Sequence, residues 1–184
     1  LLEKEIQDGT NIFCFQEVSW EWRNRLVSFF RENTYDFTYD NYGHKYNDYM
    51  GVMMAWNNKT FSAIESSVVV GDHLSEPTDL VKPTISWCEL ISSKLCRRPK
   101  PERITSYEAS MKSFKDASRR KNVLQCVQLT NSKGNIVHVM NYHMPCAFYD
   151  LEQMRLHIEF VVNLVNSKTK SAPVILTGDF NTKP

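Results

Sequence analysis

Acidic and amide side chains follow apolar, strand-like runs at two places in the sequence. Glu17 comes soon after the run Asn-Ile-Phe-Cys-Phe, and Asp179 follows Pro-Val-Ile-Leu-Thr, with Gly178 in between. If these strand ends converge on one rim, their carboxylates suit magnesium, a hard cation that prefers oxygen ligands. Gly178 lets the backbone turn and approach a ligand closely. Asn181 adds an amide that both donates and accepts hydrogen bonds near a phosphate or a water.

A histidine closes a third apolar run. His143 follows the strand-like stretch 136–142, where an imidazole supplies a proton donor or a phosphate contact. Each candidate also has an ordinary structural explanation: strand-terminal acids are usually solvated, a lone histidine is usually bonded within the fold, and Gly, Asp and Asn form turns. Their joint occurrence in this order, each after an apolar run, favours catalysis.

These motifs resemble those of the endonuclease/exonuclease/phosphatase superfamily. Phe13-Cys-Phe-Gln-Glu-Val is similar to its Leu-Gln-Glu motif, Asn-Tyr-His143-Met-Pro to its Thr-His or Leu-His strand end, and residues 174–181 to its Gly-Asp-Phe-Asn motif. Arg120-Lys-Asn122-Val resembles the segment that opens the preceding strand in deadenylase-like members. The resemblance spans nearly the whole chain. It is strongest to the deadenylase, nocturnin and 2′-phosphodiesterase branch, with the tyrosyl-DNA phosphodiesterases a close second.

The resemblance implies a role for each candidate residue. Glu17 would bind the catalytic Mg²⁺, for which Mn²⁺ is an alternative. Asp179 would orient or deprotonate the attacking water, and Asn181 would hold the scissile phosphate. His143 would contact a phosphate oxygen and stabilise charge as the pentacovalent state forms. A metal that polarises phosphoryl oxygens and acidifies water fits such hydrolysis.

The elements that must position these residues alternate along the chain. We expect a helix capped by Ser19 and another capped by Asp150, and a loop over 33–49, which is rich in Asn, Asp and Tyr. Strands are expected at 11–15, 51–56, 63–70, 123–129, 136–142 and 173–177. The second helix is expected to bury a stripe formed by Leu151, Met154, Ile158, Val161, Val162 and Val165. The fold class implied is α/β, a four-layer α/β/β/α sandwich with mixed, mainly antiparallel sheets.

Residues 74–120 interrupt this rhythm and contain a cluster of basic residues. The net charge of the chain is only +1, yet between Lys94 and Lys121 ten basic residues stand against three acidic ones. We expect a long insertion here, with a helix near 106–115. Such a segment attracts a polyanion such as RNA or DNA, although a solvated loop explains the same charge. The residues expected to contact substrate are Arg97, Arg98, Arg120 and Asn122.

Bulk composition sets further expectations. The 184 residues, 42% hydrophobic, fit one domain with its own core. No apolar run approaches the roughly 20 residues that span a membrane, so we expect no membrane contact and an intracellular protein. The five cysteines lack C-x-x-C spacing, and we expect free thiols rather than disulfides or a zinc site.

Two parts of the superfamily pattern fall outside residues 1–184. An early strand ending in Asn should lie well before Gln16, and a closing Asp-His pair should lie well beyond Asn181. We therefore expect an incomplete domain, a fragment or one completed by another polypeptide. The expected function is a magnesium-dependent phosphodiesterase or nuclease acting on RNA or DNA. A phosphatase or lipid phosphodiesterase of the same fold and a non-catalytic nucleic-acid-binding or structural subunit remain alternatives.

Overall fold

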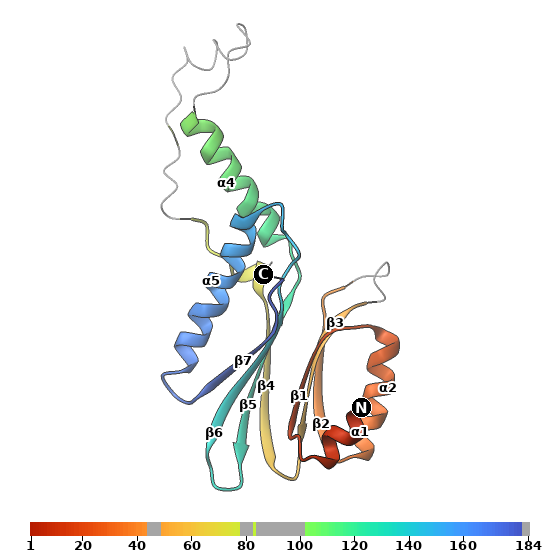
Figure 1. Cartoon of the computed structure of the whole chain (residues 1–184). Helices are drawn as coiled ribbons and strands as arrows, with labels where there is room; N and C mark the ends of the chain where they lie inside the picture. The colour runs from red at the N-terminus through yellow and green to blue at the C-terminus, as the bar shows by residue number, and fades with distance from the viewer. Residues whose placement is uncertain (44–48, 78–82, 84–101, 182–184) are drawn as a thin grey trace, which may run out of the picture.

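The computed structural model describes residues 1–43, 49–77, 83 and 102–181. Within these residues, helices and strands alternate along the chain (Figure 1). In chain order the elements are α1 (Leu2–Gln7), β1 (Ile12–Val18), α2 (Trp20–Glu32), β2 (Tyr35–Asn41), β3 (Gly51–Asn57), β4 (Phe61–Val69), the 3-10 helix η2 (Val70–His73), α4 (Glu102–Ser118), β5 (Val123–Asn131), β6 (Ile136–His143), α5 (Leu151–Lys168) and β7 (Val174–Asp179).

Two sheets lie face to face between outer layers of helices (Figure 1). The first sheet has the strand order β1-β3-β2 and is antiparallel. The second has the order β4-β5-β6-β7, antiparallel except for the parallel pair β6–β7. The helices α1 and α2 lie outside the first sheet, and α5 lies outside the second. The predicted four-layer α/β/β/α sandwich with mixed, mainly antiparallel sheets is confirmed.

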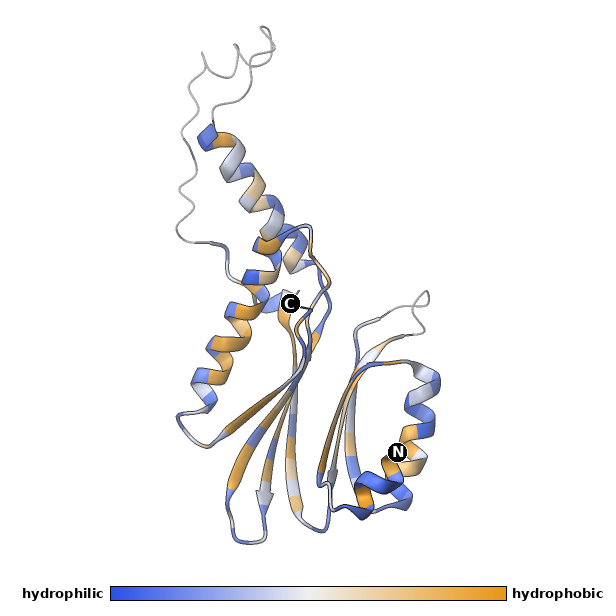
Figure 2. Cartoon of the chain, in the orientation of Figure 1, coloured by the Kyte–Doolittle hydropathy of each residue, from blue (hydrophilic) through white to orange (hydrophobic). Residues whose placement is uncertain are grey.

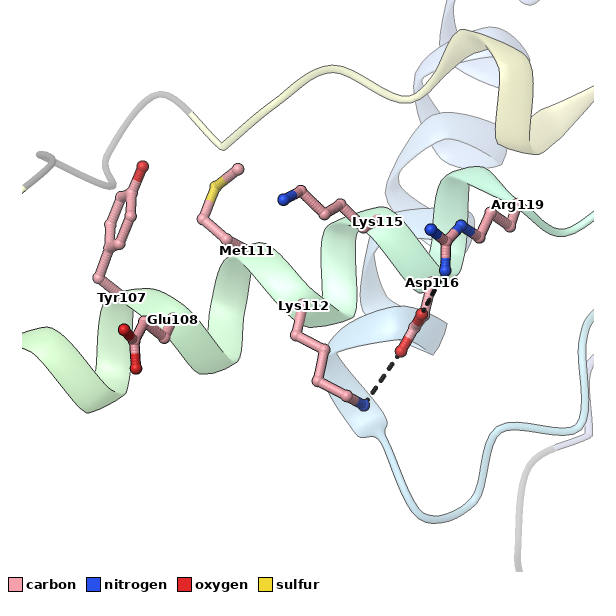
Figure 3. A pocket seen from close by; sticks show the side chains of 7 residues that line it. All are labelled: Tyr107, Glu108, Met111, Lys112, Lys115, Asp116 and Arg119. Atoms are coloured by element: carbon pink, nitrogen blue, oxygen red, sulfur yellow. Dashed lines mark hydrogen bonds and ion pairs between the residues drawn. The ribbon is translucent and has the colours of Figure 1, made fainter.

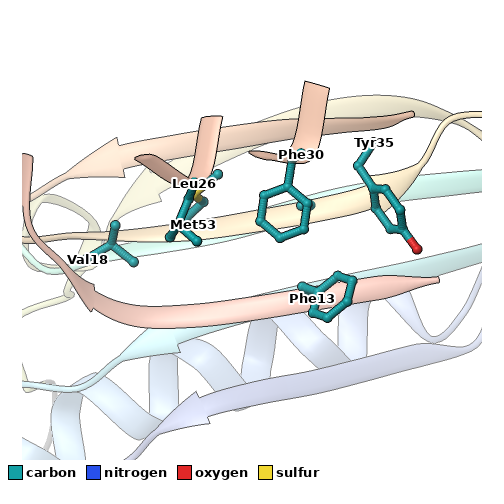
Figure 4. Close-up of a cluster of buried hydrophobic side chains, with 7 residues drawn as sticks. Phe13, Val18, Leu26, Phe30, Tyr35 and Met53 are labelled. Atoms are coloured by element: carbon teal, nitrogen blue, oxygen red, sulfur yellow. The ribbon is translucent and has the colours of Figure 1, made fainter. Parts of the chain in front are cut away.

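Each junction between layers buries its own apolar cluster. Between α2 and the first sheet, Phe30 packs on Phe13 and Tyr35, with ring centroids 5.3 and 5.6 Å apart (Figure 4). Trp56 and neighbouring residues fill the space between the sheets, and Val161 belongs to the cluster between the second sheet and α5. Burying one such large side chain contributes about 1.5–3 kcal/mol, so packing of the layers holds the rim of the sandwich in place.

The expectation of a loop over 33–49 is wrong for β2. Alternate residues Tyr35, Phe37 and Tyr39 pack on the cluster beneath α2, while β2 pairs with β3 along its whole length. Turn-forming Asn and Asp residues suggested a loop, but the aromatic residues at every second position match the two-residue period of a strand. The end of β2 leads directly to Tyr42, whose hydroxyl is hydrogen-bonded to His143, a predicted site residue.

The expected stripe of α5 is also partly wrong. Val161 is fully buried, but Leu151 and Val162 are 74% and 44% exposed. The helix buries Gln153 and His157 instead, because these two side chains hydrogen-bond to the C-terminal end of the insertion helix and its following residues. The packing of α4 against the start of α5 therefore rotates the buried face away from the predicted stripe. The cap at Asp150 is confirmed: its carboxylate accepts from the Gln153 amide at 3.1 Å.

The helix expected at 106–115 is longer, spanning all of α4, which projects beyond the sandwich (Figure 1). Figure 2 shows apolar residues concentrated on the strands and along α5, while α4 mixes polar and apolar residues. Arg97 and Arg98 lie outside the described residues. In the part of the chain that is described, no helix is long and apolar enough to cross a membrane.

Candidate active site at the rim between the sheets

The C-terminal ends of β1, β6 and β7 bring three predicted residues to one rim. Parallel pairing of β6 with β7 sets His143 beside Asp179. Glu17 approaches from the other sheet, with its Oε1 atom 3.8 Å from Nε2 of His143. Both carboxylates, of Asp179 and Glu17, raise the pKa of the nearby Cys146 thiol, after the larger effect of its partial burial. The rim therefore collects negative charge around one buried imidazole.

A bulge in β1 aims the Glu17 carboxylate. The pairing of β1 with β3 shifts register between Phe15 and Val18, and Glu17 has a φ of 56°. A residue other than glycine rarely adopts this left-handed conformation, which costs about 1–3 kcal/mol where the surroundings hold it. The Glu17 side chain is 60% exposed. Bulges of this kind re-aim side chains beside active sites.

Asn141 holds the bulge from the opposite sheet. Its buried Nδ2 atom donates to the carbonyls of Phe15 at 3.0 Å and Met53 at 3.1 Å. Its Oδ1 atom accepts from Gln16 Nε2 at 2.6 Å. One fully buried amide thus ties β6 to both β1 and β3, directly beside Glu17. Asn141 was not predicted as a site residue from the sequence, although it lies in the same Asn-Tyr-His motif as His143.

His143 is almost entirely buried, with 7% of its side chain exposed. Its Nδ1 atom is hydrogen-bonded to the Tyr42 hydroxyl, and its backbone carbonyl accepts from Asn122 Nδ2 at 2.8 Å. Its Nε2 atom is buried without a hydrogen-bond partner among the described residues. An orphaned buried polar atom is costly, and here it points to the rim beside Glu17. A phosphate oxygen would satisfy it.

Gly178 brings β7 close enough to form the rim. It has a φ of 147°, and a Cβ atom there would lie 1.9 Å from the Tyr142 carbonyl oxygen. After it, the Asn181 amide donates to Asp179 Oδ1 at 2.8 Å, and Asn181 Nδ2 donates to the Met144 carbonyl at 2.6 Å. These bonds fix the Gly-Asp-Phe-Asn turn, and they also occupy the Asn181 donor that was expected to hold a phosphate.

Arg120 and Asn122, two residues expected to contact substrate, lie behind the rim. Arg120 Nε donates to Gln153 at 2.8 Å, and a terminal nitrogen donates to the Tyr149 hydroxyl at 2.9 Å. Asn122 supports the backbone of His143 rather than facing the open rim. Arg120 still reaches the site electrostatically, because it lowers the pKa of the Cys146 thiol against the larger raising effects.

The oxygen atoms at the rim fit a hard divalent cation. Mg²⁺ commonly binds through one or two carboxylates and keeps several waters, and the exposed Glu17 carboxylate leaves room for them. Among the residues that the structure describes, no group of three or more His, Cys, Asp or Glu side chains is arranged to hold a metal. Glu17 is the exposed carboxylate at this rim.

A hollow of about 570 Å³ lies elsewhere, along the projecting helix α4 (Figure 3). It is lined by Tyr107, Glu108, Met111, Lys112, Lys115, Asp116 and Arg119. Asp116 pairs with Lys112 at 3.1 Å and with Arg119 at 3.7 Å. The carboxylate offsets part of the basic charge predicted for the insertion. The hollow is formed along one helix face and lacks the convergent strand ends of the rim.

Comparison with solved structures agrees with the layered fold. The chain is similar to the catalytic domain of human Nocturnin with bound sulfate, at 15% identity and a TM-score of 0.61, over 100% of this chain and 55% of that one. It is similar to ANGEL2, a 2′,3′-cyclic phosphatase, at 16% identity and a TM-score of 0.59, over 100% of this chain and 42% of that one. It is also similar to D. rerio TDP2 complexed with a single-strand DNA product, at 15% identity and a TM-score of 0.55, over 100% of this chain and 52% of that one.

The chain thus spans about half the length of these solved structures. A search of curated protein sequences finds no match. The model of the Endonuclease/Exonuclease/phosphatase family matches residues 2–184. The similar structures share the layered fold, and the family match covers the rim motifs at both ends of the chain. The chain belongs to the Endonuclease/Exonuclease/phosphatase family.

Proposed function

We propose that the protein hydrolyses phosphodiester bonds in RNA or DNA with the help of a divalent cation, Mg²⁺ or Mn²⁺. The observation that carries the proposal is the buried, unpartnered Nε2 atom of His143 beside the Glu17 carboxylate. A binding or structural subunit has no need of an orphaned imidazole nitrogen held next to an acid. A hydrolase uses such a donor on a phosphate oxygen.

Each rim residue has a distinct part in the proposed reaction. Glu17 holds the cation, which supplies Lewis acidity to the phosphoryl group when bound. Asp179 accepts a hydrogen bond from the attacking water and orients it. His143 donates from Nε2 to a non-bridging oxygen, where charge grows in the transition state. Asn181 holds the turn that carries Asp179, through its backbone N–H and its Nδ2 atom.

Nucleic acid is the substrate that the charge distribution favours. The basic excess between Lys94 and Lys121 suits a polyanion. Part of that excess is offset in the described residues, because Asp116 pairs with Lys112 and Arg119, and Lys121 pairs with Asp72 at 2.7 Å. The similar D. rerio TDP2 was solved with a single-strand DNA product. Arg120 lies behind the rim and would act on substrate through its charge.

A phosphatase is the second candidate, because the similar ANGEL2 is described as a 2′,3′-cyclic phosphatase. The full-length protein should be incubated with end-labelled RNA and DNA, and with oligonucleotides ending in a cyclic phosphate, with Mg²⁺ or with EDTA. Internal or stepwise strand cleavage that needs Mg²⁺ supports the first proposal. Opening or loss of the terminal phosphate with intact strands supports the second.

A matched pair of variants assigns the activity to the rim. His143→Ala should abolish turnover, since it removes the proposed oxyanion donor. His73→Ala, at an exposed histidine in η2, should leave turnover unchanged. Equal activity of both variants would remove His143 from the proposal.

A further inference from the structure

Tyr42 contacts His143 at Nδ1, the ring nitrogen opposite Nε2, and this contact bears on which ring nitrogen carries hydrogen. The hydroxyl of Tyr42 is hydrogen-bonded to Nδ1 of His143, and the two rings meet edge to face, 5.6 Å apart at an angle of 70°. The backbone of Tyr42 is fixed as well, because its amide donates to the Met50 carbonyl at 3.1 Å. Tyr42 is therefore placed as a rigid support for the imidazole.

The direction of the Tyr42–His143 hydrogen bond follows from electrostatics at the other ring nitrogen of His143, Nε2. If Nδ1 carried the hydrogen, the lone pair of Nε2 would face the Glu17 carboxylate oxygen 3.8 Å away. The Nε2 lone pair and the Glu17 carboxylate oxygen would then repel each other beside the buried ring. If Tyr42 donates to Nδ1, Nε2 carries the hydrogen and faces the carboxylate favourably. Burial, followed by the charge of Glu17, raises the pKa of Tyr42, so the hydroxyl keeps the hydrogen that it donates.

We propose that Tyr42 is a positioning residue that holds His143 in its Nε2–H tautomer, so that an N–H donor faces the phosphate at the rim. The function of this donor rests on the proposed hydrolysis, but the tautomer does not. Tyr42 supports the ring through Nδ1, which leaves Nε2 as the nitrogen that donates to the phosphate.

The tautomer can be measured directly from the ¹⁵N chemical shifts of the His143 ring, at a pH where the ring is neutral. The wild-type protein should show a protonated Nε2 and an unprotonated Nδ1. Tyr42→Phe keeps the aromatic ring and removes only the hydroxyl, so it should move both shifts toward a mixture of tautomers. Tyr142→Phe is the matched control, because Tyr142 makes the same kind of bond to His157 at 2.7 Å. It should change the shifts of His157 and leave those of His143 unchanged.

Activity gives a second readout. Tyr42→Phe should lower kcat about 3- to 10-fold, the effect of one hydrogen bond, with KM nearly unchanged because Tyr42 is proposed to act through His143. A wild-type His143 protonated on Nδ1, or an unchanged tautomer in Tyr42→Phe, would overturn the inference. If the tautomer changes as expected but the wild-type protein hydrolyses no phosphodiester, the proposed function is wrong and the role of Tyr42 stands. If Tyr42→Phe does not fold, the wild-type shifts alone decide the inference.

Discussion

Replacing Asn141 with leucine should lower the free energy of unfolding by more than the loss of one ordinary hydrogen bond would. The change keeps the approximate size and removes the amide that joins the two sheets. The Met53 carbonyl loses a buried donor at 3.1 Å, which costs about 1–3 kcal/mol when nothing replaces it. The partly buried Phe15 carbonyl loses a donor at 3.0 Å, and it costs less because water reaches it. The apolar leucine offsets about 1 kcal/mol, so the expected net loss is about 1–4 kcal/mol.

Urea unfolding of the wild-type and variant proteins measures this loss. Ser66→Ala is the control, since the Ser66 hydroxyl donates to the Cys126 carbonyl at 3.2 Å within the second sheet. It should cost no more than about 0.5–1.5 kcal/mol, one ordinary hydrogen bond. The midpoints should shift without a change in slope. A loss for Asn141→Leu no larger than that for Ser66→Ala would refute the role of Asn141 as the link between the sheets.

Three further predictions follow from backbone geometry, burial and charge. In urea unfolding, Gly178→Ala should destabilise the fold by more than about 3 kcal/mol, because the new Cβ would lie 1.9 Å from the Tyr142 carbonyl oxygen. Gly134→Ala is the control and should cost about 1 kcal/mol, because a Cβ at Gly134 would meet open space. Burial lowers the pKa of His157, so the unfolded chain takes up the proton first, and stability should fall by up to about 1.4 kcal/mol per pH unit below about pH 6.5. His157→Gln should flatten that fall in unfolding curves recorded across this range, and an unchanged slope would contradict it. In anisotropy titrations with single-stranded oligonucleotides, the dependence of log affinity on log salt should flatten by up to about two units when alanine replaces Arg97, Arg98 and Lys100.

The sequence alone was enough to predict which residues lie at the ends of helices and strands. The helix caps at Ser19 and Asp150 hold as predicted, because a cap depends on neighbours within three residues. The rim positions of Glu17 and His143 were predictable because each closes an apolar run. These signals depend on residues close together in the sequence, so contacts between distant segments do not change them.

The missed features depend on contacts between distant segments. Asn141 bonds to Phe15, 126 positions earlier in the chain, and no local pattern reveals that partner. Tyr42 bonds to His143 across 101 positions, from a segment whose composition suggested a loop. The left-handed φ of Glu17 arises in the same way, because the bulge that requires it is held by the opposite sheet.

The account depends most on Glu17 as the ligand of a catalytic cation. Glu17→Gln should be compared with Glu21→Gln, the same change at an exposed helix residue four positions later that pairs with Arg25. Hydrolysis of a labelled oligonucleotide by the full-length protein should be measured against Mg²⁺ concentration. The account predicts that Glu17→Gln abolishes the Mg²⁺-dependent rate with an unchanged unfolding midpoint, while Glu21→Gln behaves as wild type, because removing one negative oxygen weakens a divalent-ion site more than it weakens packing. A normal rate and a normal Mg²⁺ dependence in Glu17→Gln would contradict it.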